Sequence, residues 1–199
     1  MRKGELSKAK MVAATASLLR QQGYHGTGLN QILKESGAPK GSLYFHFPGG
    51  KEQLTCAALE LAGRAWQDRL DPVIEAAPDA AAAVRAVCHA LGQELSTSGY
   101  VSGCPIATVA LEAATASEAV RNTCAAQYAA WQQLIAEPLI ATGTEPTLAD
   151  ELAQFVLSTI EGALVLSRVS QSTRPLDVAG KMLEKLLADQ LAATGAAAD

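Results

Sequence analysis

The chain has 199 residues, of which 49% are hydrophobic and 18% are charged, and its formal net charge is −4. This length and apolar content are enough to bury the core of one domain or of two small ones. No stretch is apolar for long enough to predict a membrane span, and the polar N-terminal segment does not resemble a secretory signal, so we expect a cytoplasmic protein that does not act in a membrane. The four cysteines are too widely spaced for a zinc site, and we expect no metal or cofactor.

Composition favours helix along the whole chain. Ala, Leu, Gln and Glu are abundant, whereas aromatic residues make up only 5%. Hydrophobic periodicity and turn residues predict an all-α protein of about nine helices, with a three-helix head that contains a helix-turn-helix and a helical body behind it.

The first helix is predicted over about residues 7–22 and is closed by Gly23. A short second helix follows, for which Thr27 can serve as the cap, and Gly37 supplies the permissive backbone that ends it. Pro39 then starts a third helix.

In this third helix Leu43 and Phe47 are four residues apart and can point inward together. Its outer face then carries hydrogen-bond donors instead of apolar groups. Two short helices joined by such a tight turn are typical of a motif that places its second helix in a DNA groove.

The charge distribution agrees with this interpretation. Residues 1–51 hold eight Lys or Arg and two Glu, a net charge of +6, whereas the remaining residues have a net charge of −10. A basic head can approach phosphates while an acidic body stays away from them. A solvated basic terminus on an ordinary helical protein would show the same charge, so charge and motif are needed together.

Six further helices are predicted behind the head. The first of these ends at Pro72, and capping-box patterns beginning at Thr115 and Thr147 predict the starts of two later ones. The six predicted ranges are about 51–71, 79–96, 105–114, 115–139, 147–169 and 175–191.

Gly37, the run Leu43-Tyr44-Phe45-His46-Phe47 and Lys51 together resemble the DNA-binding signature of tetracycline-repressor-type (TetR family) regulators. The resemblance implies a DNA-binding head at residues 1–50 and a ligand-binding, dimerising body at residues 51–199. The segment 103–107 also resembles the start of a core helix in the LmrA/YxaF-like subgroup.

The resemblance implies that phosphates are held by Thr27, Tyr44, His46 and Lys51. The start of the third helix comes within reach of base edges, and the residues there are Lys40, Gly41 and Ser42.

Aromatic residues beyond the head are few and fall on apolar helix faces, where they are either core residues or the lining of a pocket for a neutral, hydrophobic or aromatic ligand. The candidate ligand-binding residues are Trp66, Tyr100, Cys104, Tyr128, Trp131 and Phe155. The last two helices have apolar faces suited to a dimer interface, whose candidate residues are Phe155, Gly162, Ala163, Leu176, Leu183 and Leu187.

Nothing in the sequence resembles a catalytic set, because the three histidines are scattered and no nucleophile–base pattern accompanies them. We expect a homodimeric repressor that binds a pseudo-palindromic operator and is released by a small hydrophobic or aromatic effector. One alternative is a redox- or electrophile-sensing regulator, since Cys104 precedes a helix start that would lower its thiol pKa. A small helical enzyme or carrier is the other.

Overall fold

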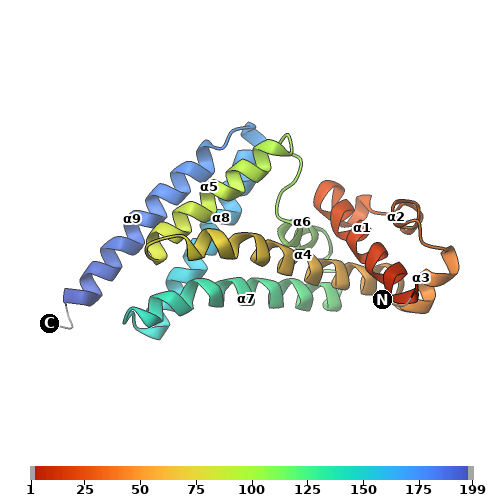
Figure 1. Cartoon of the computed structure of the whole chain (residues 1–199), viewed down its shortest axis with the longest axis horizontal. Helices are drawn as coiled ribbons and strands as arrows, with labels where there is room; N and C mark the ends of the chain where they lie inside the picture. The colour runs from red at the N-terminus through yellow and green to blue at the C-terminus, as the bar shows by residue number, and fades with distance from the viewer. Residues whose placement is uncertain (1–2, 197–199) are drawn as a thin grey trace. The chain divides into compact units, whose positions relative to one another are not determined.

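The computed structural model describes residues 3–196, and every regular element in this range is an α-helix (Figure 1). This confirms the predicted all-α fold and its nine helices within the described residues. The helices are α1 (Lys3–Gly26), α2 (Leu29–Ser36), α3 (Lys40–His46), α4 (Gly50–Glu75), α5 (Ala80–Thr97), α6 (Pro105–Ala113), α7 (Glu118–Ala141), α8 (Pro146–Ser170) and α9 (Arg174–Ala196).

The chain forms two compact units. The first contains the chain up to Trp66 together with Cys104–Gln127, and the second contains Gln67–Gly103 and the chain from Tyr128 onward. Helix α6 therefore belongs to the same unit as α1, α2 and α3, and it packs against α1.

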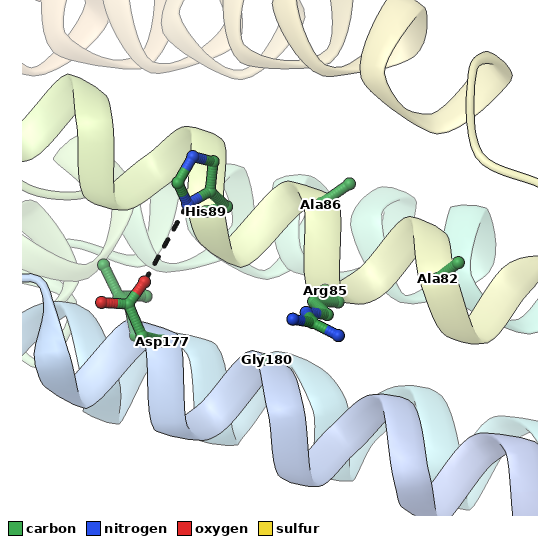
Figure 2. A pocket seen from close by; sticks show the side chains of 7 residues that line it. Ala82, Arg85, Ala86, His89, Asp177 and Gly180 are labelled. Atoms are coloured by element: carbon green, nitrogen blue, oxygen red, sulfur yellow. Dashed lines mark ion pairs between the residues drawn. The ribbon is translucent and has the colours of Figure 1, made fainter.

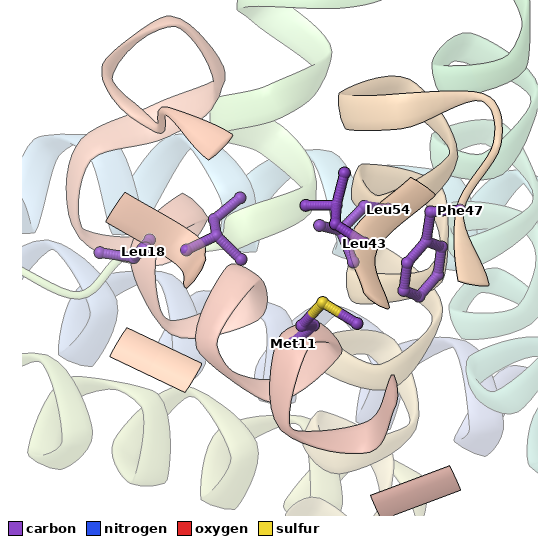
Figure 3. Packing of buried hydrophobic residues seen from close by; sticks show 6 residues of the cluster. Met11, Leu18, Leu43, Phe47 and Leu54 are labelled. Atoms are coloured by element: carbon purple, nitrogen blue, oxygen red, sulfur yellow. The ribbon is translucent and has the colours of Figure 1, made fainter. Parts of the chain in front are cut away.

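A small apolar core holds the first three helices to the start of α4 (Figure 3). Its residues come from every one of these helices and from the segment after α3, and each is at most 6% exposed. They are Met11, Leu18, Ile32, Leu43, Phe47 and Leu54. Leu43 and Phe47 thus point inward, as their spacing predicts.

The turn between α2 and α3 is made by Gly37, whose backbone adopts the left-handed conformation with φ 63°. The predicted cap of α2 is wrong, because the N-cap residue is Gly28 and its position has no side-chain capping bond. The Thr27 hydroxyl instead donates to the carbonyl of Gly23 at 2.7 Å and is buried. Thr27 therefore ties the start of α2 back to the end of α1.

The last turn of α1 is interrupted at Gly23, which has φ 73° and ψ −172°. This backbone conformation is almost exclusive to glycine. A Cβ at this position would also overlap the carboxylate of Glu112 on α6. The stop signal at Gly23 is thus a kink after which the helix resumes to Gly26.

Several predicted helix ends lie elsewhere in the structure, among them the start of α1, which is at Lys3 and not near residue 7. Helix α4 continues past Pro72 to Glu75, where the carbonyl that proline leaves without a donor belongs to the exposed residue Asp68 and can bind water. The hydroxyl of Ser117 accepts from the Val120 N–H at 3.1 Å at the start of α7, and Glu145 caps α8. Capping-box spacing alone therefore placed both starts at the wrong residues.

In the second unit, α9 packs against both α5 and α8, and α5 also contacts α8. Helix α5 begins at the predicted place, since the Asp79 side chain accepts from the Ala82 N–H. Gly180 allows α9 to approach α5 closely, because a Cβ there would lie 2.8 Å from the Cβ of Cys88.

Replacing the kink glycine should destabilise the first unit. We expect Gly23→Ala to lower the free energy of unfolding by about 2–3 kcal/mol, because alanine disfavours this backbone conformation and would displace Glu112. Gly41→Ala is the control, since nothing lies within 4 Å of a Cβ there and alanine favours helix. Thermal and urea unfolding measure the stability of both variants. Equal stability of Gly23→Ala and wild type would show that the kink does not require glycine.

Candidate nucleic-acid interface

Burial of Leu43 and Phe47 fixes which side of α3 faces solvent. Successive residues of a helix are about 100° apart, so Phe45 lies about 180° from the mean direction of these two anchors. Phe45 is 80% exposed and Tyr44 is 64% exposed, and both Lys40 and Gly41 are also exposed. We refer to these four exposed residues, of which Lys40 lies at the N-terminal end of the helix, as the outer face of α3.

Ser42 and His46 are partly buried and face α1. The Ser42 hydroxyl donates to the carbonyl of Pro39 at 2.7 Å and lies 3.4 Å from the hydroxyl of Ser7. The His46 ring meets the Phe45 ring edge-on, with centroids 4.9 Å apart. Of the residues predicted to reach base edges, Lys40 and Gly41 are thus exposed, whereas Ser42 is partly buried and hydrogen-bonded within the chain.

Lys51 lies at the start of α4 and secures the end of α1. Its ammonium group donates to the carbonyl of Tyr24 at 2.7 Å and lies 4.2 Å from the centre of the Tyr24 ring. Burial lowers the pKa of Lys51, an effect opposed by the carboxylate of Glu112, and burial raises the pKa of Tyr24. Lys51 therefore has a structural role in the head besides any contact with phosphate.

The buried position of Thr27 corrects the expectation that its hydroxyl holds a phosphate. The residue is 0% exposed, and its hydroxyl already donates within the chain. Its side chain therefore has no surface to offer a ligand in this structure.

Glu112 on α6 belongs to no motif and could not be singled out from the sequence. Its carboxylate accepts from the backbone N–H of His25 at 2.8 Å, and its carbonyl oxygen lies 3.2 Å from Nε2 of the same histidine. It thus fastens α6 to the kinked end of α1. Only the fold brings these segments together, since they are 87 positions apart in the sequence.

The expected ligand-binding residues are divided between the two units. Trp66 and Cys104 are buried in the first, and the Cys104 sulfur accepts from the Ala107 N–H at 3.4 Å. In the second, the rings of Tyr128 and Trp131 pack edge-to-face with centroids 5.7 Å apart.

The remaining two candidates for ligand binding do not join this aromatic pair by any described ring contact. Tyr100 is half buried in a loop, where its φ is 62°. Phe155 is 54% exposed on α8 and is a surface residue.

A groove of about 370 Å³ lies between α5 and α9 (Figure 2). Two ion pairs cross from α5 to α9. Arg85 contacts Glu184 at 2.7 Å, and Nδ1 of His89 lies 4.0 Å from Asp177. The rim of this groove is therefore charged, whereas the pocket expected for the effector is neutral and apolar.

Helices α8 and α9 present an exposed apolar face. Its members are 52–79% exposed although all are large and hydrophobic, and they are Phe155, Val165, Leu166, Val169, Val178 and Met182. We refer to these six residues as the α8–α9 face. Gly162, an expected interface residue, is also exposed on α8.

Four other expected interface residues are instead buried inside the chain. Ala163, Leu176, Leu183 and Leu187 are at most 6% exposed, because the packing of α9 against α5 and α8 has already covered them. The apolar periodicity of these helices thus contained a core stripe and a surface stripe, and the prediction selected mainly the core stripe.

Two family models match separate parts of this chain. Residues 11–58 match the DNA-binding domain of bacterial regulatory proteins of the tetR family, and residues 80–182 match the C-terminal domain of LmrA/YxaF-like transcriptional regulators. The chain belongs to the TetR family. It is therefore a DNA-binding transcriptional regulator with an LmrA/YxaF-like C-terminal domain, and not an enzyme.

Individual relatives cover nearly the whole of this TetR-family regulator. It is 39% identical over 170 residues to the transcriptional regulator LmrA of Bacillus subtilis, which covers 85% of this chain and 90% of LmrA. The structure of reduced NemR, a transcriptional repressor of Escherichia coli, superposes with a TM-score of 0.79 at 24% identity, over 90% of this chain and 95% of that one.

A cysteine mutant of CifR, solved in complex with a 26-bp operator duplex, has the same fold. Its TM-score is 0.75 at 22% identity, over 89% of this chain and 94% of CifR.

Two lysines of the head should respond differently to the same substitution. We expect Lys40→Met to leave stability unchanged but to weaken DNA binding and relax its preference at particular bases, since Lys40 is exposed at the start of α3, where base edges come within reach. Lys51→Met should lower the free energy of unfolding by about 1 kcal/mol, because the Tyr24 carbonyl loses its donor. Binding titrations at several salt concentrations measure the DNA affinity of both variants, and thermal melts measure their stability. Equal losses of affinity and of stability in the two variants would contradict the separate roles of Lys40 and Lys51.

Proposed function

We propose that this regulator is a homodimeric repressor that binds a pseudo-palindromic operator and leaves it when a small hydrophobic or aromatic effector binds the body. The observation that carries the proposal is the outer face of α3, where a lysine, a glycine and two aromatic rings are exposed on a helix anchored by Leu43 and Phe47. A short exposed helix of this kind, in a unit with a basic N-terminal segment, suits the major groove.

The relatives support the regulatory part of the proposal. NemR is named as a repressor, and CifR was solved on operator DNA. In this chain, Lys40 and Tyr44 would contact the DNA directly, and His46 would reach a phosphate from the edge of the same face. Lys51 and Thr27 would act mainly by holding α1, α2 and α4 in position.

The α8–α9 face supports dimerisation. Single chains rarely leave large contiguous apolar surfaces exposed, because burying an apolar side chain away from water lowers the free energy. By length and composition alone, helix α8 could span a membrane, since the mean hydropathy of an 18-residue stretch within it is 1.4. However, 39% of this stretch is buried within the chain. The inner side of α8 is buried within the helical second unit, and the chain matches an LmrA/YxaF-like regulator. Both observations favour a second copy of this chain, and not lipid, as the partner that covers the outer side of α8.

A two-fold dimer would carry two α3 helices and therefore favour an operator with two-fold symmetry. In helix-turn-helix dimers the half-sites lie about one helical turn apart, roughly 34–36 Å, or somewhat further apart where the DNA is distorted.

The aromatic residues of the body support an effector site, with the Tyr128–Trp131 pair as its proposed recognition element. Edge-to-face rings of this type offer an apolar surface to a flat or hydrophobic ligand. Release of DNA then requires the effector to bind one arrangement of the chain more tightly than the other.

A regulator that senses oxidants or electrophiles through Cys104 is the second candidate. The sulfur caps α6 and accepts an N–H bond, which would stabilise a thiolate. Cys104 is only 4% exposed, however, so an oxidant or electrophile in solution has little access to its sulfur. We therefore keep the effector-released repressor as the proposal.

A charge on the α8–α9 face should separate the dimer. We expect Val169→Glu, at a side chain that is 79% exposed, to give a monomer that has lost operator affinity, since a single head contributes only half of the contacts. Val101→Glu, at an exposed loop residue outside this face, is the matched control and should remain a dimer. Light scattering at micromolar concentration measures both, and a monomeric wild type would refute dimerisation.

Effector and operator should weaken each other by the same factor. A coupling of about 1–3 kcal/mol corresponds to about 5–150-fold in affinity, and reciprocity applies it to both ligands. A thermal-shift screen of hydrophobic compounds identifies a ligand, and tryptophan fluorescence titrations with and without operator measure the coupling. A ligand that binds equally well under both conditions and still releases DNA would contradict this mechanism.

A further inference from the structure

Phe45 is the large apolar side chain most exposed on α3, and the core of the head does not use it. It is 80% exposed and lies on the side of α3 opposite Leu43 and Phe47, so no rotation of the helix that keeps those anchors buried can bring it inside. Its one described ring contact is the edge of His46. An exposed ring at this place adds nothing to the packing of the head.

The surroundings of Phe45 leave room for a flat partner. Gly41 lies one helical turn before it on the same side, and nothing is found within 4 Å of the position where a Cβ of Gly41 would be. Because Gly41 has no side chain, a nucleic-acid base edge can approach the backbone beside the ring. The planes of the His46 and Phe45 rings stand at 81° to one another. This contact keeps the Phe45 side chain on one flank of the helix.

The chemistry of the major groove determines which base edge suits such a ring. Thymine presents a 5-methyl group there, whereas cytosine presents an amino donor and the purines present acceptors at N7. A phenyl ring offers no hydrogen bond, so covering those polar groups would leave them unpaired, while covering a methyl group removes apolar surface from water.

We propose that Phe45 is a specificity-determining residue that reads the 5-methyl group of one thymine in each operator half-site. This inference rests on the proposed operator binding and adds to it a preference that the lysines cannot supply. Lys40 and Tyr44 on the adjacent flank can donate to phosphates or to acceptor atoms, which every sequence offers in some form.

The test removes the methyl group from the DNA and the ring from the protein separately. An operator is first selected from a random duplex library by the wild-type full-length chain, and each thymine is then replaced by deoxyuridine symmetrically in both half-sites. The binding of each duplex is measured for wild type, Phe45→Ala, Phe45→Leu and Tyr44→Ala. Tyr44→Ala is the matched control, because it removes the neighbouring exposed ring of similar size.

We expect one thymine per half-site at which uracil weakens wild-type binding by about fourfold per half-site, the value for one buried methyl group. The penalty should disappear in Phe45→Ala, remain in Tyr44→Ala and remain in part in Phe45→Leu. At the same position 5-methylcytosine should bind better than cytosine. Thermal melts should show unchanged stability for Phe45→Ala, because the side chain is exposed.

The possible failures are distinguishable. If no uracil substitution affects wild type, if the selected half-site contains no thymine, or if the penalty survives in Phe45→Ala, the reading role is wrong while operator binding stands. A wild-type chain that selects no DNA sequence would overturn both the proposed function and this inference.

Discussion

Burial of Leu43 and Phe47 is the constraint on which the proposed DNA-binding surface depends. Helix α3 has only seven residues and would not be stable alone, so its orientation comes from these two anchors in the core with Met11 and Leu54. Once they are inside, the 100° step of the helix turns Tyr44 and Phe45 outward. A small core therefore determines which side chains can meet a base.

A second interaction extends the head beyond the helix-turn-helix. The carboxylate of Glu112 occupies the space left by Gly23 and accepts from the N–H of His25, while Lys51 donates to the carbonyl of Tyr24. Groups from α4 and α6 thus both hold the short segment of α1 that follows its kink. Within the first unit, any displacement of α6 would act directly on α1, the helix that carries Met11 and Leu18 of the head core.

The two C-terminal helices show how one apolar composition serves two purposes. Leu176, Leu183 and Leu187 of α9 are buried in the chain, whereas Val178 and Met182 on the same helix are more than half exposed. A helix that is apolar over more than half of its circumference needs a second partner after its first face is covered. The α8–α9 face is such a second apolar side, and it consists only of ordinary hydrophobic residues.

Sequence by itself determined the helical class, the order of the helices and the DNA-binding motif, because these depend on local signals. Gly37, Pro39 and the spacing of Leu43 and Phe47 act within one or two turns of chain, and the structure places them as predicted. Local signals failed where a nearby residue could perform the same role. Ser117 caps α7 in place of Thr115, and the exposed end of α4 tolerates Pro72 because water can satisfy the carbonyl.

Tertiary structure decided which apolar stripe became core and which residues meet across the chain. The burial of Thr27, the placement of Glu112 against Gly23 and the exposure of Val165 and Val169 depend on contacts between segments far apart in sequence. Periodicity shows that a helix has an apolar side but not which neighbour will cover it, since that is fixed only when the helices pack.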